Sequence, residues 1–434
     1  MINVRKTVLL SLLSYEENER YANLEADSVL SRQLIDERDR AFYTALFYGV
    51  IERKITLDYQ ISKLYNRSLD TLQLKVKMLL RMGLYQIIYM DSIPAHAAVN
   101  ETVALAKSMV NPGAVGLING VLRTAINELY DDTGNLSLKT PDRTRDNCGW
   151  LSIRYGYPRY LCKLWVRAYG EEAAEKIMLA QNRRPFITLR VNLLKTERAD
   201  FLTKLCEAGC QASPSSLTDD GIIINGGSIT ALPGYEEGLF FVQDDSSRMA
   251  ISAFSPQPGE TILDTCACPG GKSFASAIMM QNSGKIVSAD IHENKLSLIA
   301  SGAERLGINI IEPIAADTSK YRSEFDGAFD RVLCDVPCSG FGTISKKPDL
   351  RHKSKASIEA LSPLQYSILE NCSRYVRRGG TLMYSTCTLN PAENEDNVSK
   401  FCSGHPEFTL LKSVTNFPYY THSDGFFYAV IRKD

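Results

Sequence analysis

Two short segments of the sequence combine cysteine with predicted strand ends. One segment contains Asp335 and Cys338, and the other contains Cys387. Apolar stretches at 331–335 and 381–385 lead into these segments and are typical of strands. The carboxyl ends of parallel strands open onto one edge of a sheet, where such folds bind their ligands. We therefore expect the two cysteines and the carboxylate to face the same ligand.

Two thiols and a carboxylate beside one cofactor suit methylation of a cytosine at carbon 5. That carbon is a poor nucleophile, so an enzyme first adds a thiolate to carbon 6 and forms an enamine. One cysteine can add, the other can assist departure, and Asp335 can hydrogen-bond the ring edge and hold or supply a proton. An isolated cysteine is more often a small buried hydrophobic residue. The chemical interpretation therefore depends on both segments lying at one edge.

A structural zinc site is the alternative use of the cysteines. Cys266 with Cys268, and Cys334 with Cys338, have the spacing of zinc ligands. Such sites usually add paired histidines, and the sequence has no histidine cluster near these pairs. Both pairs also fall in predicted turns at strand ends. We expect no metal.

A glycine pair follows the predicted strand at 261–264. Gly270 and Gly271 lack side chains, so the backbone can approach a ligand before a helix starts. The sequence Gly-Gly-Lys-Ser suggests a P-loop, but a P-loop requires glycine where this chain has Cys266. The glycine pattern of dinucleotide-binding folds is absent as well. A simple turn between a strand and a helix is the plainer alternative.

Two acidic residues favour a ligand that carries a ribose and an adenine. Asp290 ends the next predicted strand, about twenty residues after the glycines, where doubly wound folds place a carboxylate on ribose hydroxyls. Asp317 follows another apolar run and can accept a hydrogen bond from an adenine amino group. A single acid at a strand end usually caps a helix, but two in register with the turn favour an adenosyl ligand without phosphates. We predict that S-adenosylmethionine binds to Asp290, Asp317, Asp335 and the turn residues Cys266, Ala267, Cys268, Pro269, Gly270, Gly271 and Lys272.

The surrounding sequence predicts a helical region followed by alternating strands and helices. Apolar residues recur at spacings of three and four up to about residue 130, which is typical of amphipathic helices. From Ile187 onward short β-rich runs alternate with helical segments, as in a doubly wound parallel sheet. We predict an all-α domain at 1–135, a linker with connecting helices at 136–180, a small α/β subdomain at 181–245 and a Rossmann-type domain at 246–434.

Composition limits the possible settings of the protein. Forty-nine basic residues oppose fifty acidic ones, for a net charge of -1, so there is no global electrostatic case for nucleic acid. Eleven cysteines in a chain of this size are unlike a disulfide-stapled secreted scaffold and favour a reducing compartment. No stretch is long and apolar enough to span a membrane, and the run at 8–13 is too short for a signal peptide. We expect a cytoplasmic monomer with no membrane partner.

A local basic run directly after Cys338 suggests a contact with nucleic acid. A solvated loop is the plain alternative for any such run. Its place beside the predicted catalytic edge favours contacts with phosphates. The run contains a single acid, Asp349, among the basic residues Lys346, Lys347, Arg351, Lys353 and Lys355.

Together these residues resemble the Sun/Fmu-type, RsmB-like family of RNA cytosine-carbon-5 methyltransferases. The family's Thr-Cys and Pro-Cys motifs correspond to Thr386-Cys387 and Pro337-Cys338. The resemblance implies that Cys387 is the nucleophile and that Cys338 helps to release the product. It also implies that the cofactor turn is the stretch from Cys266 to Lys272.

The resemblance extends over nearly the whole chain. The segments 83–86, 93–101 and 116–123 are similar to the family's NusB-like RNA-binding domain, and 242–247 and 424–427 match its methyltransferase part. There are two departures. Cys268 replaces a small alanine in the cofactor turn, and Lys347-Pro348-Asp349 replaces a commoner His-Pro-Asp.

The family implies methylation of 16S ribosomal RNA, and two other functions stay open at this point. The same chemistry can act on a cytosine of transfer RNA or DNA. A non-catalytic RNA-binding or antitermination factor can keep the fold as a scaffold. The complete set of Asp335, Cys338 and Cys387 argues against the second possibility.

Overall fold

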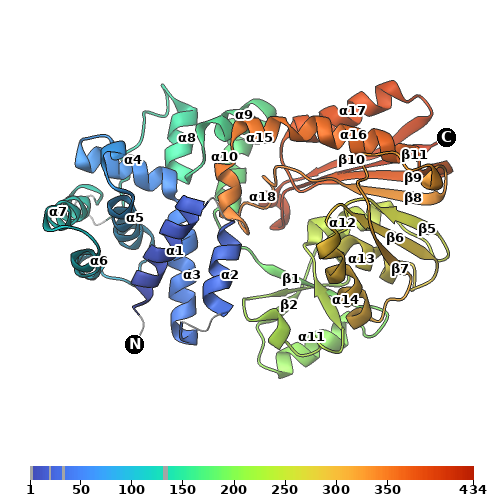
Figure 1. Ribbon diagram of the computed structural model, residues 1–434, viewed down its shortest axis with the longest axis horizontal. Coiled ribbons are helices and arrows are strands. Elements are labelled where there is room, and N and C mark those ends of the chain that lie inside the picture. Colours follow the sequence, from blue (N-terminus) through green and yellow to red (C-terminus); the bar gives the residue numbers. More distant parts are fainter. Residues whose placement is uncertain (1–2, 19–20, 32–34, 131–134) are drawn as a thin grey trace. The chain divides into compact units, whose positions relative to one another are not determined.

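The computed structural model describes residues 3–18, 21–31, 35–130 and 135–434. The chain forms two compact units, whose elements are labelled in Figure 1. The helical unit comprises Met1–Met178 with Lys346–His352, and the sheet unit comprises Leu179–Ser345 with Lys353–Asp434. Residues 131–134, next to the predicted linker, lie outside the described residues. The four domain ranges expected from the sequence stay predictions, because two compact units do not test them.

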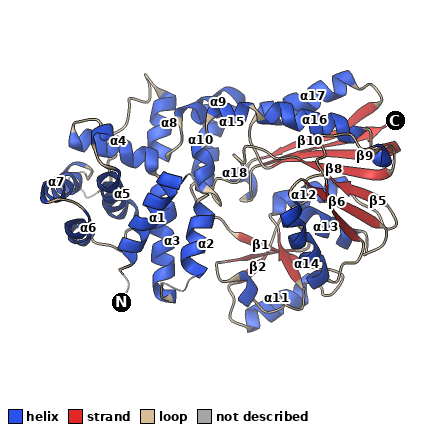
Figure 2. Cartoon of the chain, in the orientation of Figure 1, coloured by secondary structure: helices blue, strands red, loops and turns tan. Residues whose placement is uncertain are grey.

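The helical unit is built around α5 (Leu74–Tyr89). This helix is apolar on nearly every side and contacts five other helices, α1, α3, α4, α6 and α7. A Cβ on Gly83 would lie 2.6 Å from a methyl carbon of Leu122 and 3.2 Å from the hydroxyl of Thr102, so glycine permits this close approach. The other helices, blue in Figure 2, are α1 (Val4–Asn18), α2 (Ala22–Ser31), α3 (Glu37–Glu52), α4 (Lys54–Tyr65), α6 (Ala95–Met109), α7 (Pro112–Glu128), α8 (Asn147–Tyr155), α9 (Arg159–Tyr169) and α10 (Glu171–Gln181).

The segment Lys346–His352 belongs to the helical unit, although the chain on both sides of it belongs to the sheet unit. The Arg351 side chain is fully buried, donates to the carbonyl oxygens of Glu52 (2.9 Å) and Gly156 (3.2 Å), and lies over the Tyr157 ring. The expected phosphate contact of Arg351 is therefore wrong, because its guanidinium holds backbone carbonyls instead. Lys346 and Lys347 are exposed.

The sheet unit begins with a small antiparallel sheet of strand order β2-β3-β1-β4. Its core includes Leu189, Phe201 and Phe240. The buried Arg190 guanidinium pairs with Asp220 and Asp245, which ties the sheet to the start of the next helix. The elements are β1 (Ile187–Val191), α11 (Arg198–Glu207), β2 (Ala212–Pro214), β3 (Gly221–Ile224) and β4 (Phe240–Val242).

A larger sheet follows, with strand order β10-β11-β9-β8-β5-β6-β7. Strands β5 to β9 run parallel to one another, whereas β11 is antiparallel to both of its neighbours. These strands, red in Figure 2, are β5 (Thr261–Asp264), β6 (Lys285–Asp290), β7 (Ile311–Ala315), β8 (Phe329–Asp335), β9 (Val376–Thr386), β10 (Phe408–Asn416) and β11 (Phe426–Lys433).

Helices cover both faces of the large sheet, because successive strand residues point to opposite sides. Ile262 and Met383 lie in an apolar cluster with α12, α13 and α14, whereas their neighbours Leu263 and Leu382 lie in a cluster with α16 and α17. The expected fold class, a helical region followed by a doubly wound α/β domain, is confirmed. The helices are α12 (Asp245–Phe254), α13 (Gly271–Met279), α14 (Leu296–Leu306), α15 (Lys355–Glu359), α16 (Leu361–Ser373), α17 (Glu395–Gly404) and α18 (Pro418–Thr421).

No helix in the described part of the chain combines the length and the apolar character that a membrane span requires.

Candidate active site

The order of the parallel strands reverses between β5 and β8. After β5 the chain adds β6 and β7 on one side, and β8 then returns to the other side of β5. Ligands of such sheets bind where the order reverses, at the carboxyl ends of the two strands. A pocket of about 180 Å³ lies there, lined by Val242, Gln243, Asp244, Ser247, Asp264, Cys266, Ala267, Cys268, Pro269, Gly271, Lys272 and Asp335.

Six of the seven predicted turn residues line this pocket, and Gly270 does not. Gly270 instead shapes the turn, with a φ of 110° that L side chains rarely adopt. A Cβ there would lie 2.5 Å from the Phe274 ring. Its carbonyl accepts the hydrogen bond of the Phe274 amide (2.8 Å), which starts α13 immediately beside the pocket.

Asp290 lies beside the turn but does not line the pocket. Its carboxylate accepts hydrogen bonds from the backbone amides of Cys268 (3.1 Å) and His292 (2.9 Å). It therefore holds the turn as well as the end of its own strand.

Asp317 also lies outside the residues that line the pocket. It accepts hydrogen bonds from the Ser319 hydroxyl (2.6 Å) and amide (3.1 Å) and pairs with Lys320 (3.0 Å). These contacts lower the pKa of Asp317, and the Ser319 hydroxyl has the largest effect. The carboxylate thus stabilises a local turn, and its predicted contact with an adenine stays a prediction.

Asp264 is a pocket residue to which the sequence analysis gave no role. It ends β5, is buried, and accepts the Ser273 hydroxyl at 2.7 Å through Oδ2. Its Oδ1 has no hydrogen-bond partner among the described residues. Burial raises the pKa of Asp264 to about 7, although the Ser273 hydrogen bond opposes the shift. An acid directly before the glycine turn was the signal that could have identified it.

Lys272 and Asp335 form an ion pair at the inner side of the pocket. The Lys272 ammonium lies 2.6 Å from Asp335 Oδ2, and the Ser385 hydroxyl donates to Asp335 Oδ1 at 2.8 Å. Burial disfavours the charged lysine, but the nearby Asp335 outweighs burial and raises the pKa of Lys272. The carboxylate at the end of β8 is therefore held from both β9 and α13.

The two predicted catalytic cysteines are in direct contact. Their sulfur atoms lie 3.2 Å apart, although Cys338 follows β8 and Cys387 follows β9. The hydrogen bond between the two thiols lowers the pKa of Cys387 and raises the pKa of Cys338. Burial raises both pKa values. At Cys387 the Asp335 carboxylate also raises the pKa, and the Lys272 ammonium lowers it by a smaller amount. The two thiols are therefore unequal, and Cys387 loses its proton more readily than Cys338.

A close backbone approach fixes the position of Cys387. The Gly342 amide donates to the Cys387 carbonyl at 2.9 Å, and the Gly425 amide donates to the Gly342 carbonyl at 2.9 Å. A Cβ on Gly342 would lie 1.7 Å from the Gly425 carbonyl oxygen, so a side chain cannot occupy this position.

The remaining cysteines of the edge lie in different surroundings. Cys266 packs in the apolar cluster of Cys334 and Cys372, and burial raises its pKa far above the usual range. The Cys268 thiol instead lies 3.4 Å from the Lys295 carbonyl. Within the described ranges, no group of three His, Cys, Asp or Glu side chains is arranged to hold a metal ion.

Family models match three parts of the chain. Residues 251–432 match the 16S rRNA methyltransferase RsmB/F model, 2–127 match the NusB family, and 157–230 match the ferredoxin-like domain of RsmF/B-like methyltransferases.

Similar proteins extend over nearly the full length. A probable ribosomal RNA small subunit methyltransferase B of Bacillus subtilis (strain 168) is 36% identical over 450 residues, covering 99% of both chains. The ribosomal RNA small subunit methyltransferase B of Escherichia coli O1:K1 / APEC is 34% identical and covers 93% of this chain and 92% of its own.

Solved structures share the fold. The crystal structure of the protein PH0851 superposes with a TM-score of 0.77 at 26% identity, covering 94% of each chain. A methyltransferase homolog protein from Pyrococcus horikoshii gives a TM-score of 0.59 at 28% identity, covering 65% of this chain and 98% of its own.

The raised pKa of Asp264 predicts a stability change with pH in the ligand-free protein. The folded state keeps a proton on Asp264 that the unfolded chain loses near pH 4. The free energy of unfolding is therefore highest below pH 4 and falls as the pH rises to about 7. Asp264→Asn should abolish this pH-dependent loss of about 4 kcal/mol, because the pKa rises from 3.8 to about 7 and one pKa unit corresponds to about 1.4 kcal/mol. Urea unfolding at pH 4, 6 and 8 measures this, and parallel pH curves for variant and parent would contradict it.

Proposed function

Because the chain belongs to the RsmB/F family of 16S rRNA methyltransferases, we propose that it methylates carbon 5 of a cytosine in 16S ribosomal RNA. The observation that carries the cytosine chemistry is the contact between the sulfur atoms of Cys387 and Cys338, 3.2 Å apart beside the pocket. A base stacked in a helix hides carbon 6, so the target must be splayed out of its stack. A cytosine in a loop meets this requirement at the lowest cost.

Methyltransferases of this family use S-adenosylmethionine, which supplies an electrophilic methyl group when bound. The residues around the pocket fit this cofactor. The buried Asp264 oxygen without a hydrogen-bond partner and the Asp335 carboxylate give the pocket a negative character that suits a cationic ligand. The turn from Cys266 to Lys272, Asp290 and Asp317 are the residues that we propose to hold it.

Cys387 acts first in the proposed reaction. Its thiolate adds to carbon 6 and breaks the π bond between carbon 5 and carbon 6. The π electron pair shifts onto carbon 5, is delocalised towards ring nitrogen 3, and makes carbon 5 nucleophilic. Asp335 accepts a hydrogen bond from the edge of the cytosine, while Lys272 holds this carboxylate in place. Methylation at carbon 5 then leaves a neutral ring that is still bonded to Cys387.

Cys338 acts second. The charge on Cys387, which helps to raise the Cys338 pKa, disappears when the carbon–sulfur bond forms. Cys338 can then lose its proton to water and take the proton from carbon 5. The carbon 5–carbon 6 double bond re-forms, the bond to Cys387 breaks, and Cys387 leaves as a thiolate. The reaction leaves one proton on Cys338.

The substrate is tested with purified protein, S-adenosylmethionine, and 16S ribosomal RNA or transfer RNA. We expect one new 5-methylcytosine in the ribosomal RNA, because the full-length relatives are small-subunit methyltransferases. Bisulfite sequencing locates the modified base. Methylation of transfer RNA alone would favour the other substrate, and no methylation of any RNA would favour a scaffold protein.

Single cysteine variants test the order of the two steps. Cys387→Ala should abolish turnover and leave no covalent adduct, because no thiolate remains to attack carbon 6. Cys338→Ala should methylate once and accumulate a protein–RNA complex, because the carbon 5 proton stays in place. Denaturing gels with labelled RNA separate these outcomes, and the double variant should form no complex. Adducts from Cys387→Ala would reverse the assignment.

A basic face on α8 and α9 supports RNA binding by the helical unit. Arg159, Lys163 and Arg167 are exposed and recur every four residues, so they lie on one side of α9, where Arg159 pairs with Asp146. Leu161, Cys162 and Trp165 occupy the buried side. Arg154 of α8 adds a fourth exposed charge, and no acidic residue occurs between residues 147 and 169.

Phosphate contacts on this face predict a salt-dependent loss of affinity. The double variant Lys163→Ala, Arg167→Ala should bind RNA more weakly. The slope of log affinity against log salt should fall by about 1–2, because binding with fewer phosphate contacts releases fewer counterions. Fluorescence titration at several salt concentrations measures the slope. Lys176→Ala is the control, since its ammonium pairs with Glu172. An unchanged slope in the double variant would place the phosphates elsewhere.

A further inference from the structure

Glu393 is fully buried and is not one of the residues that line the proposed cofactor pocket. The sequence analysis gave it no role. Its Oε2 accepts the Ser339 amide (2.8 Å) and the Gln365 side-chain amide (2.8 Å). Its Oε1 accepts the Asn390 side-chain amide (2.8 Å). A buried carboxylate is costly unless its oxygens are hydrogen-bonded, so these donors explain why it is tolerated. One of these donors, the Ser339 amide, belongs to the residue that follows Cys338.

The backbone around Cys338 is held from several elements. Gln365 of α16 also donates to the Pro337 carbonyl at 2.9 Å, and Lys353 donates to the Ser339 carbonyl at 3.0 Å. The Ser339 hydroxyl lies 2.6 Å from the hydroxyl of Thr388, the residue after Cys387. Glu393 is the member of this set that receives the Ser339 amide.

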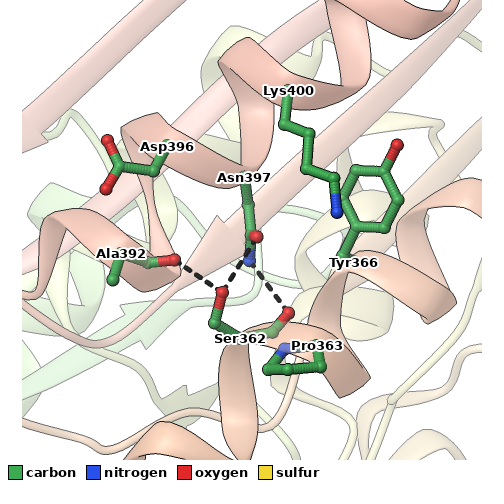
Figure 3. Close-up of a pocket in the computed structure, with 7 residues that line it drawn as sticks. All are labelled: Ser362, Pro363, Tyr366, Ala392, Asp396, Asn397 and Lys400. Atoms are coloured by element: carbon green, nitrogen blue, oxygen red, sulfur yellow. Dashed lines mark hydrogen bonds between the residues drawn. The ribbon is translucent and has the colours of Figure 1, made fainter.

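Glu393 itself is firmly placed. It ends the short turn Pro391–Glu393, and the Tyr384 hydroxyl donates to its backbone carbonyl. Figure 3 shows the next contacts: the Ser362 hydroxyl donates to the Ala392 carbonyl (2.8 Å) and to Asn397 (3.1 Å). The backbone of the Pro391–Glu393 turn is therefore anchored to β9 and α16.

Cys387 depends less on Glu393. It follows β9, whose last residues pair with β11, as in Thr386 with Phe427. Its own carbonyl accepts the Gly342 amide. Loss of the Glu393 carboxylate would release the Ser339 amide while leaving the strand pairing beside Cys387 in place.

We propose that Glu393 is a positioning residue that holds the Cys338 turn for product release, an inference that rests on the proposed two-cysteine reaction. Cys338 must reach the proton on carbon 5 while carbon 6 is bonded to Cys387, so its sulfur must keep its place relative to the Cys387 sulfur. Glu393 fixes that place through the Ser339 amide. Its removal slows release far more than attack and methylation.

The test compares Glu393→Gln with the parent, using RNA that the parent methylates. The Gln side chain has the same shape but presents one acceptor and one donor where the structure directs three N–H groups, so at least one hydrogen bond is lost. Rapid-quench single-turnover assays give the rate of the first methyl transfer, and denaturing gels give the decay of the covalent complex. We expect decay to slow at least tenfold, with the first methyl transfer within threefold of the parent.

Two further variants at or near this position separate positioning from general damage. Glu395→Gln is the matched control: it removes a carboxylate two residues away that accepts the Thr415 hydroxyl on β10, and it should change neither rate. Glu393→Asp keeps the charge on a shorter side chain and should recover part of the release rate. Equal losses in both steps for Glu393→Gln, or a parent-like decay, would overturn the inference.

Parallel measurements distinguish a failure of this inference from a failure of the proposed function. If Cys338→Ala accumulates the complex and Glu393→Gln does not, the positioning role alone is wrong. If neither accumulates it, the two-cysteine reaction is wrong. Should Glu393→Gln not yield folded protein by circular dichroism, Gln365→Leu takes its place, because it removes the donor shared by Pro337 and Glu393. The same slow decay is then expected, and a parent-like decay would again overturn the inference.

Discussion

The catalytic edge depends on β8 pairing with β5 on one side and β9 on the other. Parallel pairing brings the ends of these strands to one edge. The cofactor turn, Asp335 and the two cysteines therefore lie close together, although they come from separate segments of the chain. The register places Asp335 beside Ser385, which bonds its carboxylate. A slip of one residue would turn these side chains to opposite faces of the sheet. The apolar clusters on the two faces therefore stabilise the fold. They also fix the strand register, which determines which side chains meet at this edge of the sheet.

The resting edge carries more negative than positive groups. Asp335 pairs with the Lys272 ammonium, which also lowers the pKa of Cys387, while burial raises the pKa of Asp264 to about 7. A cationic ligand in the pocket would favour the charged form of Asp264 and lower its pKa. Cofactor binding is thereby linked to proton release from this carboxyl. The pocket is consequently suited to a sulfonium compound and poorly suited to a phosphate, in agreement with the absence of a P-loop at Cys266.

The sequence predicted the parts of the site that are continuous in the chain. The strands at 261–264 and 285–290 lie where periodicity placed them, and six of the seven turn residues line the pocket. It could not predict which acids turn inward, since a carboxylate at a strand end can bond its own turn, as Asp317 does. Nor could a basic run reveal that Arg351 is buried among backbone carbonyls. These outcomes depend on which distant segments meet, and local pattern does not encode that.

The sign of the charge at Glu393 matters as much as its hydrogen bonds. A lysine or arginine could also hold a carbonyl of the Cys338 turn, as Lys353 does. A second cation at the position of Glu393, however, would stabilise a thiolate on Cys338 and remove the proton that Cys338 shares with Cys387. The Glu393 carboxylate instead adds to the raised pKa of Cys338, after the larger effects of the Cys387 contact and burial. In the proposed reaction the same group would place Cys338 and help to keep it protonated, so that Cys387 attacks first and Cys338 acts in the second step.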